Sequence, residues 1–268
     1  MRIRPDLRLP REHGAWVMLY VPFMIGALAG SRSSVRIVPL LLLLLSVTLI
    51  FVARESMLEW LRARGRGKPS RPASIRLLIY LGFGGLFGAP LLVIYDRWWL
   101  APLAGLIVML LAFNTWQAVR REDRSVIGET VAILGLTLTA PAAYYVAGGT
   151  WDTRAWLLWM LCSFYFASSV FYVKLRVHSQ NRRRDELRRQ SWRRCATYHL
   201  FLTAALVLLS ATGSLDLFAL VAFSPVLART FWQLAKPGGH MSLRRVGLLE
   251  VLYSVIFLVF VAISFRAG

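Results

Sequence analysis

Cysteine, histidine and acidic residues are all scarce in this chain. Its 268 residues include two cysteines, four histidines and 13 Asp or Glu, against 32 Lys or Arg. Cys162 and Cys195 are far apart, so the sequence offers neither a disulfide framework nor the spaced ligands of a zinc or haem site. A long polar stretch that could fold as a soluble domain is also missing. With 57% hydrophobic residues and a mean hydropathy of +0.56, the composition excludes an ordinary soluble protein.

Apolar stretches fill most of the chain instead. Each is close to the roughly 17–25 residues that a helix needs to cross the hydrocarbon core. They cover residues 14–30, 35–53, 77–95, 97–113, 126–147, 155–173, 196–212, 215–233 and 246–265. We therefore predict an all-α fold, a polytopic transmembrane bundle of about nine spans, in which residues 1–268 form a single integral membrane domain.

The basic residues are distributed unevenly about these spans. All but five of the 32 fall on the side of the amino terminus; the exceptions are Arg32, Arg36, Arg97, Arg154 and Arg266. Lys and Arg accumulate in cytoplasmic loops, so we expect a bacterial cytoplasmic (inner) membrane protein with its amino terminus inside and its carboxyl terminus outside. The predicted cytoplasmic basic loops are 54–76, 114–125, 174–195 and 234–245. Segment 174–195 lacks Gly and Pro, and its composition fits a basic helix lying along the membrane surface.

The net charge of +19 would point to nucleic acid in a soluble protein. Next to membrane spans it favours the bilayer as partner, because each cation near an anionic leaflet contributes about 1 kcal/mol. We therefore expect anionic phospholipid head groups as partners and no nucleic acid. The basic start and the first apolar stretch also resemble a secretory signal peptide, but the stretch is long for a signal core, and this alternative stays open.

Polar residues in or beside the spans gather at the predicted cytoplasmic ends, where they would line an inward cavity. In REHGAW, Glu12 would begin the first span and Gly14 and Ala15 would let a neighbouring helix approach. Glu55 and Glu59 share one helix face with Arg62, so they could chelate Mg²⁺ or pair with arginines. Glu129 would lie in the first turn of the fifth span, and Arg229, near the end of the eighth, could face the interior or equally reach the head groups. A cationic entry to the cavity would be formed by Lys174, Arg176, His178 and His199. Further polar positions of this kind are Arg54, Asn114 and Glu250.

Several motifs resemble a known family. LPREHGAWVMLYVPFMIG, VARESMLEWLRARG, RSVIGETVAI, TAPAAYYVAGG and YVKLR followed by YHL are similar to the YwiC-like family of bacterial membrane proteins. The resemblance runs over nearly the whole chain and is most specific at REHGAW. It implies membrane placement and no particular reaction.

The architecture is also similar to that of the UbiA-type prenyltransferases. In that superfamily, acidic motifs after spans two and six hold Mg²⁺, which neutralises an isoprenyl diphosphate. The position after span two here carries RESMLEW, where Glu55 and Glu59 match part of the first motif. The position after span six carries YVKLRVH, which is basic where the superfamily is acidic.

Three hypotheses follow. The first is a UbiA-like cavity for an amphipathic or anionic ligand such as a prenyl diphosphate, an isoprenoid or a quinone-like molecule, with or without catalysis. The second is a transporter, a class that often has helices broken near the membrane midplane. Helices could kink at Pro22, Pro39, Pro90, Pro141 and Pro225, but the predicted outer side lacks charged groups for a second gate. The third is an assembly protein for a respiratory or envelope complex.

The first hypothesis assigns roles to particular residues and gathers most of them in one pocket. Glu55 and Glu59 would hold Mg²⁺, and Glu129 or Glu250 would act catalytically by orienting an acceptor or removing its proton. The ligand-binding residues would be Glu12, His13, Arg54, Asn114, Lys174, Arg176 and His199. The third hypothesis expects the same charged groups to be scattered or paired among themselves.

Overall fold

A computed structural model describes residues 13–31, 37–67, 70–120, 125–148, 150–179, 185–236 and 242–267. These residues form ten helices and contain no strand: α1 (His13–Gly30), α2 (Ile37–Gly65), α3 (Arg71–Val93), α4 (Leu100–Val119), α5 (Val126–Thr137), α6 (Thr139–Gly148), α7 (Thr153–Ser179), α8 (Asp185–Ala211), α9 (Leu217–Ala235) and α10 (Leu243–Ala267). The all-α prediction is confirmed.

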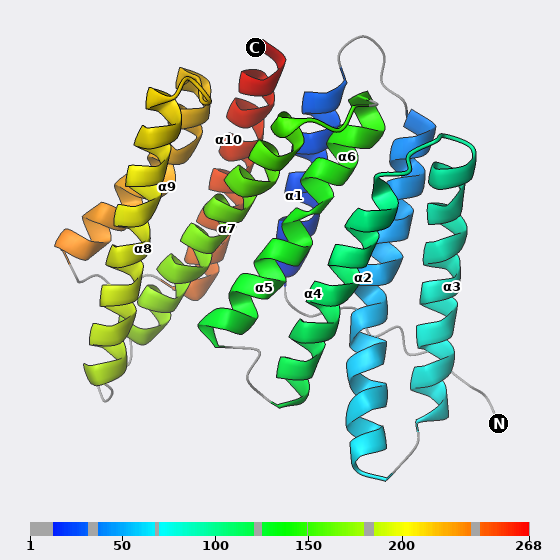
Figure 1. Cartoon of the computed structure of the whole chain (residues 1–268). Coiled ribbons are helices and arrows are strands. Elements are labelled where there is room, and N and C mark those ends of the chain that lie inside the picture. The colour runs from blue at the N-terminus through cyan, green and yellow to red at the C-terminus, as the bar shows by residue number, and fades with distance from the viewer. Residues whose placement is uncertain are drawn as a thin grey trace.

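The helices run up and down as one bundle (Figure 1). In the described residues eight segments are long and apolar enough to cross a membrane, with α5 and α6 together counted as one. The apolar part of α1, Gly14–Gly30, is a little shorter. In this view α1 runs upward and α10 also runs upward, ending at the top of the bundle. The chain is a multi-pass membrane protein.

Several predicted loops prove to be helical extensions. α2 continues to Gly65 and α4 to Val119, and they take up much of segments 54–76 and 114–125. Segment 174–195 is not a separate surface helix, because residues 174–179 end α7 and 185–195 begin α8. Apolar and basic parts share the same helix because nothing in the sequence breaks it at the membrane boundary. Only the short gaps between helices remain for the predicted loops.

The fifth crossing is interrupted at Leu138, between α5 and α6. Pro141 has no N–H, so it cannot bond to the Thr137 carbonyl four residues earlier, and the helix tightens there. Next to it, the single hydroxyl hydrogen of Thr139 is within donating distance of two carbonyl oxygens, those of Leu136 and Leu19, both at 2.9 Å. The contact with Leu19 ties the interruption to α1.

α1 and α6 cross at very short range. A Cβ atom added at Gly26 would overlap the Ala140 carbonyl oxygen, and one at Gly30 would overlap that of Tyr144. Small residues four apart allow this backbone contact in membranes. A Cβ at Gly14 would meet nothing, so the expected close approach lies further along α1 than predicted.

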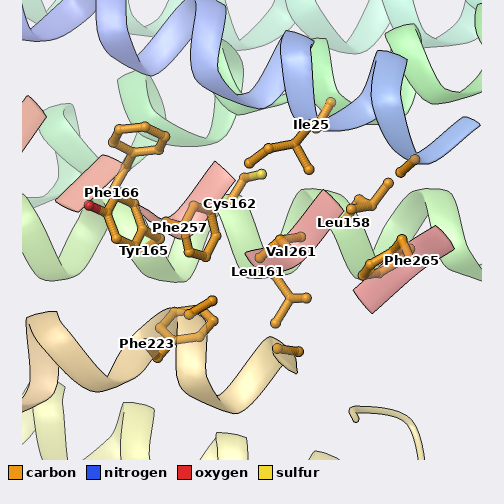
Figure 2. Close-up of a cluster of buried hydrophobic side chains, with 14 of the residues drawn as sticks. Ile25, Leu158, Leu161, Cys162, Tyr165, Phe166, Phe223, Phe257, Val261 and Phe265 are labelled. Carbon is orange, nitrogen blue, oxygen red and sulfur yellow. The ribbon is translucent and has the colours of Figure 1, made fainter. Parts of the chain in front are cut away.

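Two apolar clusters lie on either side of this central pair. One joins α1 to α7, α9 and α10 through side chains including Ile25, Tyr165 and Phe257, which Figure 2 shows. The rings of Tyr165 and Phe257 stack at 4.0 Å between centroids. The other cluster joins α1 and α6 to α2, α3 and α4 through Phe23 and Leu91. The cavity described below lies on this second side.

Candidate functional site

A cavity of about 150 Å³ lies between α1, α2, α4 and the interrupted α5–α6 crossing. Two facing stripes form most of its wall. α2 contributes Val47, Ile50, Phe51 and Arg54, and α4 contributes Ile107, Leu110, Leu111 and Asn114. Both sets follow the i, i+3, i+4, i+7 spacing that places side chains on one helix face. The remaining lining residues are Ala15, Leu19, Val131, Ala132, Gly135, Leu136 and Thr139.

The cavity is apolar along its length and polar at one end. Each stripe has three apolar residues and finishes on a polar one, Arg54 or Asn114. Most lining side chains on α2, α4 and α5 are half-buried, so the cavity communicates with its surroundings. This arrangement suits a molecule with an apolar body and a polar head.

Hydrogen bonds fix the polar end. Arg54 donates from Nε and Nη2 to Asn114 Oδ1, at 3.2 and 2.8 Å, and from Nη1 to Glu55 Oε1 at 3.1 Å. Asn114 Nδ2 donates to the Gly128 carbonyl at 3.0 Å. α2, α4 and the start of α5 are therefore linked around the head of the cavity.

The two carboxylates predicted to hold Mg²⁺ both pair with arginines. Glu55 pairs with Arg54, and Glu59 accepts from Arg76 Nη2 at 2.7 Å. Within the described part of the chain, no three His, Cys, Asp or Glu side chains come together as a metal site would need. Of the two alternatives left open by the sequence, arginine pairing is the one observed.

A second charged pair lies beside α7. Glu129 is in the first turn of α5, as predicted, and its carboxylate contacts Lys174 Nζ at 2.5 Å. The pair joins α5 to α7 and does not line the cavity. Partial burial makes it a stronger contact than an exposed surface pair.

A third polar cluster lies among α7, α9 and α10. Arg229 forms a two-pronged pair with Glu250, and the side chains are only 9% and 17% exposed. The guanidinium lies over the rings of Tyr172 and Tyr253, at 4.3 and 4.8 Å from their centroids. The sequence leaves two placements open for Arg229, toward the lipid head groups or toward the protein. In the structure its side chain faces the protein. The contact of the Arg229 guanidinium with the rings of Tyr172 and Tyr253 was not predicted from the sequence.

The remaining predicted site residues lie apart from the cavity. Arg176 donates to Gln233 Oε1 at 2.5 Å, and His199 Nε2 bonds Ser168 Oγ at 2.9 Å. Both side chains are buried, at 3% and 0% exposure, so neither forms a cationic entry. Glu12 lies outside the described residues, and of His13 only its place at the start of α1 is described.

The structure therefore divides the predicted site into separate parts. Arg54 and Asn114 meet at the cavity, with Glu55 beside them, whereas Glu129 with Lys174 and Arg229 with Glu250 form separate pairs. The sequence predictions concentrated on charged and polar residues, so they did not include the apolar side chains that line most of the cavity. The repeated stripe spacing on α2 and α4 was a usable signal, because each stripe ends on a polar residue.

Comparison with known proteins identifies the family. The model of the YwiC-like protein family matches residues 9–144. The chain belongs to the YwiC-like family. It is 26% identical over 257 residues to the uncharacterized protein YwiC of Bacillus subtilis (strain 168), which covers 93% of this chain and 95% of that protein. An uncharacterized protein of Haemophilus influenzae is 24% identical over 260 residues, covering 96% and 98%.

The matched region contains every residue that lines the cavity, from Ala15 to Thr139. No solved structure matches the chain, so the similarity to UbiA-type prenyltransferases remains a sequence-based expectation.

Proposed function

We propose that this YwiC-like protein binds an amphipathic ligand, with its apolar body along the α2 and α4 stripes and its polar head at Arg54 and Asn114. The observation that supports this is the shared design of the stripes, each apolar for two turns and then polar at the same end. The common pattern matches one amphipathic molecule lying between the two helices, with its apolar and polar parts at the same depths as theirs.

The proposal is one of binding, without prenyl transfer. The expected metal ligands Glu55 and Glu59 each pair with an arginine, and Glu129 and Glu250 each pair with a cation outside the cavity. Such pairing also matches what an assembly protein was expected to have, so the ligand-binding proposal depends on the cavity alone.

Transport is the second candidate, and the interruption between α5 and α6 favours it. Gly135, Leu136 and Thr139 flank this break and also line the cavity. Broken helices in membrane proteins are tolerated where the backbone lines a cavity or is buried in protein, and in transporters they form binding sites.

We further propose that the protein resides in the bacterial cytoplasmic membrane with its basic helix ends inside. The described basic residues gather at helix ends on one side of the bundle, which is the side that the charge rule assigns to the cytoplasm.

The cavity is tested by native mass spectrometry of the purified protein with its co-extracted lipids. Gly135→Leu would extend a side chain from the cavity wall toward Leu110, whose Cβ lies 3.7 Å from a Cβ built at position 135. Gly105→Leu on α4 is the matched control, because a Cβ there meets nothing within 4 Å. We expect a retained amphipathic ligand in the wild type and the control, lost in Gly135→Leu. Bulk phospholipid alone, unchanged by Gly135→Leu, would overturn the proposal.

A further inference from the structure

We infer that the head of the bound ligand is an uncharged ring carrying carbonyl oxygens, a quinone on an apolar tail, and not a diphosphate. This inference rests on the proposed function and narrows it to one ligand class. It depends on three observations: the charge at the polar end of the cavity, the Arg54 N–H groups that have no partner among the described residues, and the volume of the cavity.

The charge at the polar end is too small for a diphosphate. Arg54 is the one charged side chain that lines the cavity in the described part of the chain, and the Glu55 carboxylate already pairs with it. A diphosphate carries several negative charges and is normally held by Mg²⁺ with carboxylate ligands or by several cations. The nearby Glu59 is itself paired with Arg76. The net charge offered to the ligand is therefore close to zero.

The hydrogen-bonding capacity of the same end fits a carbonyl oxygen. A guanidinium has five N–H donors. Three of those on Arg54 are used by Asn114 and Glu55, and the other two have no partner among the described residues. Two donors on a partly buried group can serve one or two acceptor oxygens. An uncharged acceptor satisfies them without adding charge to a low-dielectric site.

The shape of the cavity fits a ring. A cavity of about 150 Å³ is of the size that holds a benzene molecule in another protein, at about 150 Å³. Phe51, one turn from Arg54, presents an aromatic wall, and Gly135 leaves the opposite wall free of a side chain. The α2 stripe from Arg54 back to Val47 spans about 10 Å at 1.5 Å per residue. The site would hold the ring and the first part of a tail, whose remainder would extend into the bilayer.

The test compares ligands that differ only in the head. Binding to the purified full-length protein in detergent is measured calorimetrically for a ten-carbon alkyl benzoquinone, the matching alkyl benzene and geranyl diphosphate with and without Mg²⁺. We expect the quinone to bind at least tenfold more tightly than the alkyl benzene, because the latter leaves the Arg54 donors unpaired. Geranyl diphosphate should bind more weakly than the quinone, and Mg²⁺ should not change that order.

Variants assign the preference to Arg54. Arg54→Gln should remove the tenfold advantage of the quinone, whereas Arg76→Gln, which breaks a comparable Arg–Glu pair away from the cavity lining, should keep it. Arg54→Lys keeps the charge and loses the forked donors, so it should also lose most of the preference. It provides a second variant should Arg54→Gln fail to fold.

The outcomes separate the two proposals. Equal binding of quinone and alkyl benzene, or tighter binding of geranyl diphosphate with Mg²⁺, overturns the quinone inference and leaves ligand binding standing when Gly135→Leu abolishes it. Failure of every probe to bind, or binding unchanged in Gly135→Leu, overturns the proposed function itself.

Discussion

At the scale of single residues, several partly buried charges form pairs that neutralise one another. Arg229 and Glu250 are the most enclosed of them, and the flat faces of Tyr172 and Tyr253 cover the guanidinium. An ionised side chain in the membrane interior is costly unless it is paired. The pair therefore links α9 to α10, in addition to apolar packing such as that of Phe223 against Phe257.

Removal of one partner of this pair should therefore cost more than removal of both. We expect Arg229→Leu to destabilise the protein by about 3–5 kcal/mol because Glu250 would be left buried and unpaired. The double variant Arg229→Leu with Glu250→Leu should recover most of this loss. Thermal unfolding in detergent, followed by circular dichroism, measures both. A double variant that is no more stable than the single one would contradict this account.

At the scale of helices, backbone contact decides how α1 and α6 pack. Gly26 and Gly30 bring α1 against the carbonyl oxygens of Ala140 and Tyr144. The Thr139 hydroxyl adds a bond to the Leu19 carbonyl at the point where α5 gives way to α6. Because carbonyl oxygens cannot move aside as a flexible side chain can, this contact tolerates no added atoms.

Adding a single methyl group at Gly26 should destabilise the protein, because the contact between α1 and α6 leaves no room for it. Gly26→Ala places a Cβ on the Ala140 carbonyl oxygen, and forced overpacking of this kind typically costs about 1–3 kcal/mol. Gly105→Ala is the matched control; it meets nothing and should be neutral or slightly stabilising, by up to about 1 kcal/mol, through helix propensity. The same unfolding measurement applies. Equal stability of the two variants would show that the helices can separate without cost.

Some features at the scale of helices could be predicted from the sequence, and others could not. Glu129 was correctly placed in the first turn of its helix, because the N-capping Ser125 and the following apolar run are local signals. Gly14 was predicted to be the close contact in place of Gly26, because several small residues occur along α1 and only the partner helix distinguishes them. The cavity was expected to bring acidic and basic groups together and is mostly apolar, because partners such as Arg76 come from a neighbouring helix and pair with those groups outside the cavity lining.

At the scale of the whole molecule, the two apolar clusters share α1 and α6. Ile25 and Ala140 belong to the cluster with α7, α9 and α10, and Phe23 and Ala143 to the cluster with α2, α3 and α4. The cavity lies on the second side and the Arg229–Glu250 pair on the first. The two sides are connected through this central pair and through the contacts between α5 and α7, such as Glu129 with Lys174.

The orientation of the bundle gives a prediction at this scale. Because basic residues concentrate at one set of helix ends, we expect those ends in the cytoplasm and the carboxyl terminus outside. Alkaline phosphatase fused after residue 268 should be active, whereas a fusion between residues 66 and 70 should be inactive. Green fluorescent protein fused at the same two sites should give the reverse pattern. Activity of both phosphatase fusions would contradict the assignment.

The sequence by itself determined the all-α membrane class, the succession of apolar segments able to cross a membrane, and the family. Each of these depends on local quantities: the length of an apolar run, the spacing of side chains on one helix and the short motifs around REHGAW. Only the tertiary structure decided which charges pair, which glycines touch a neighbouring backbone and where a cavity remains. These depend on how helices distant in sequence cross, and a charged residue carries no local sign of the partner that will neutralise it.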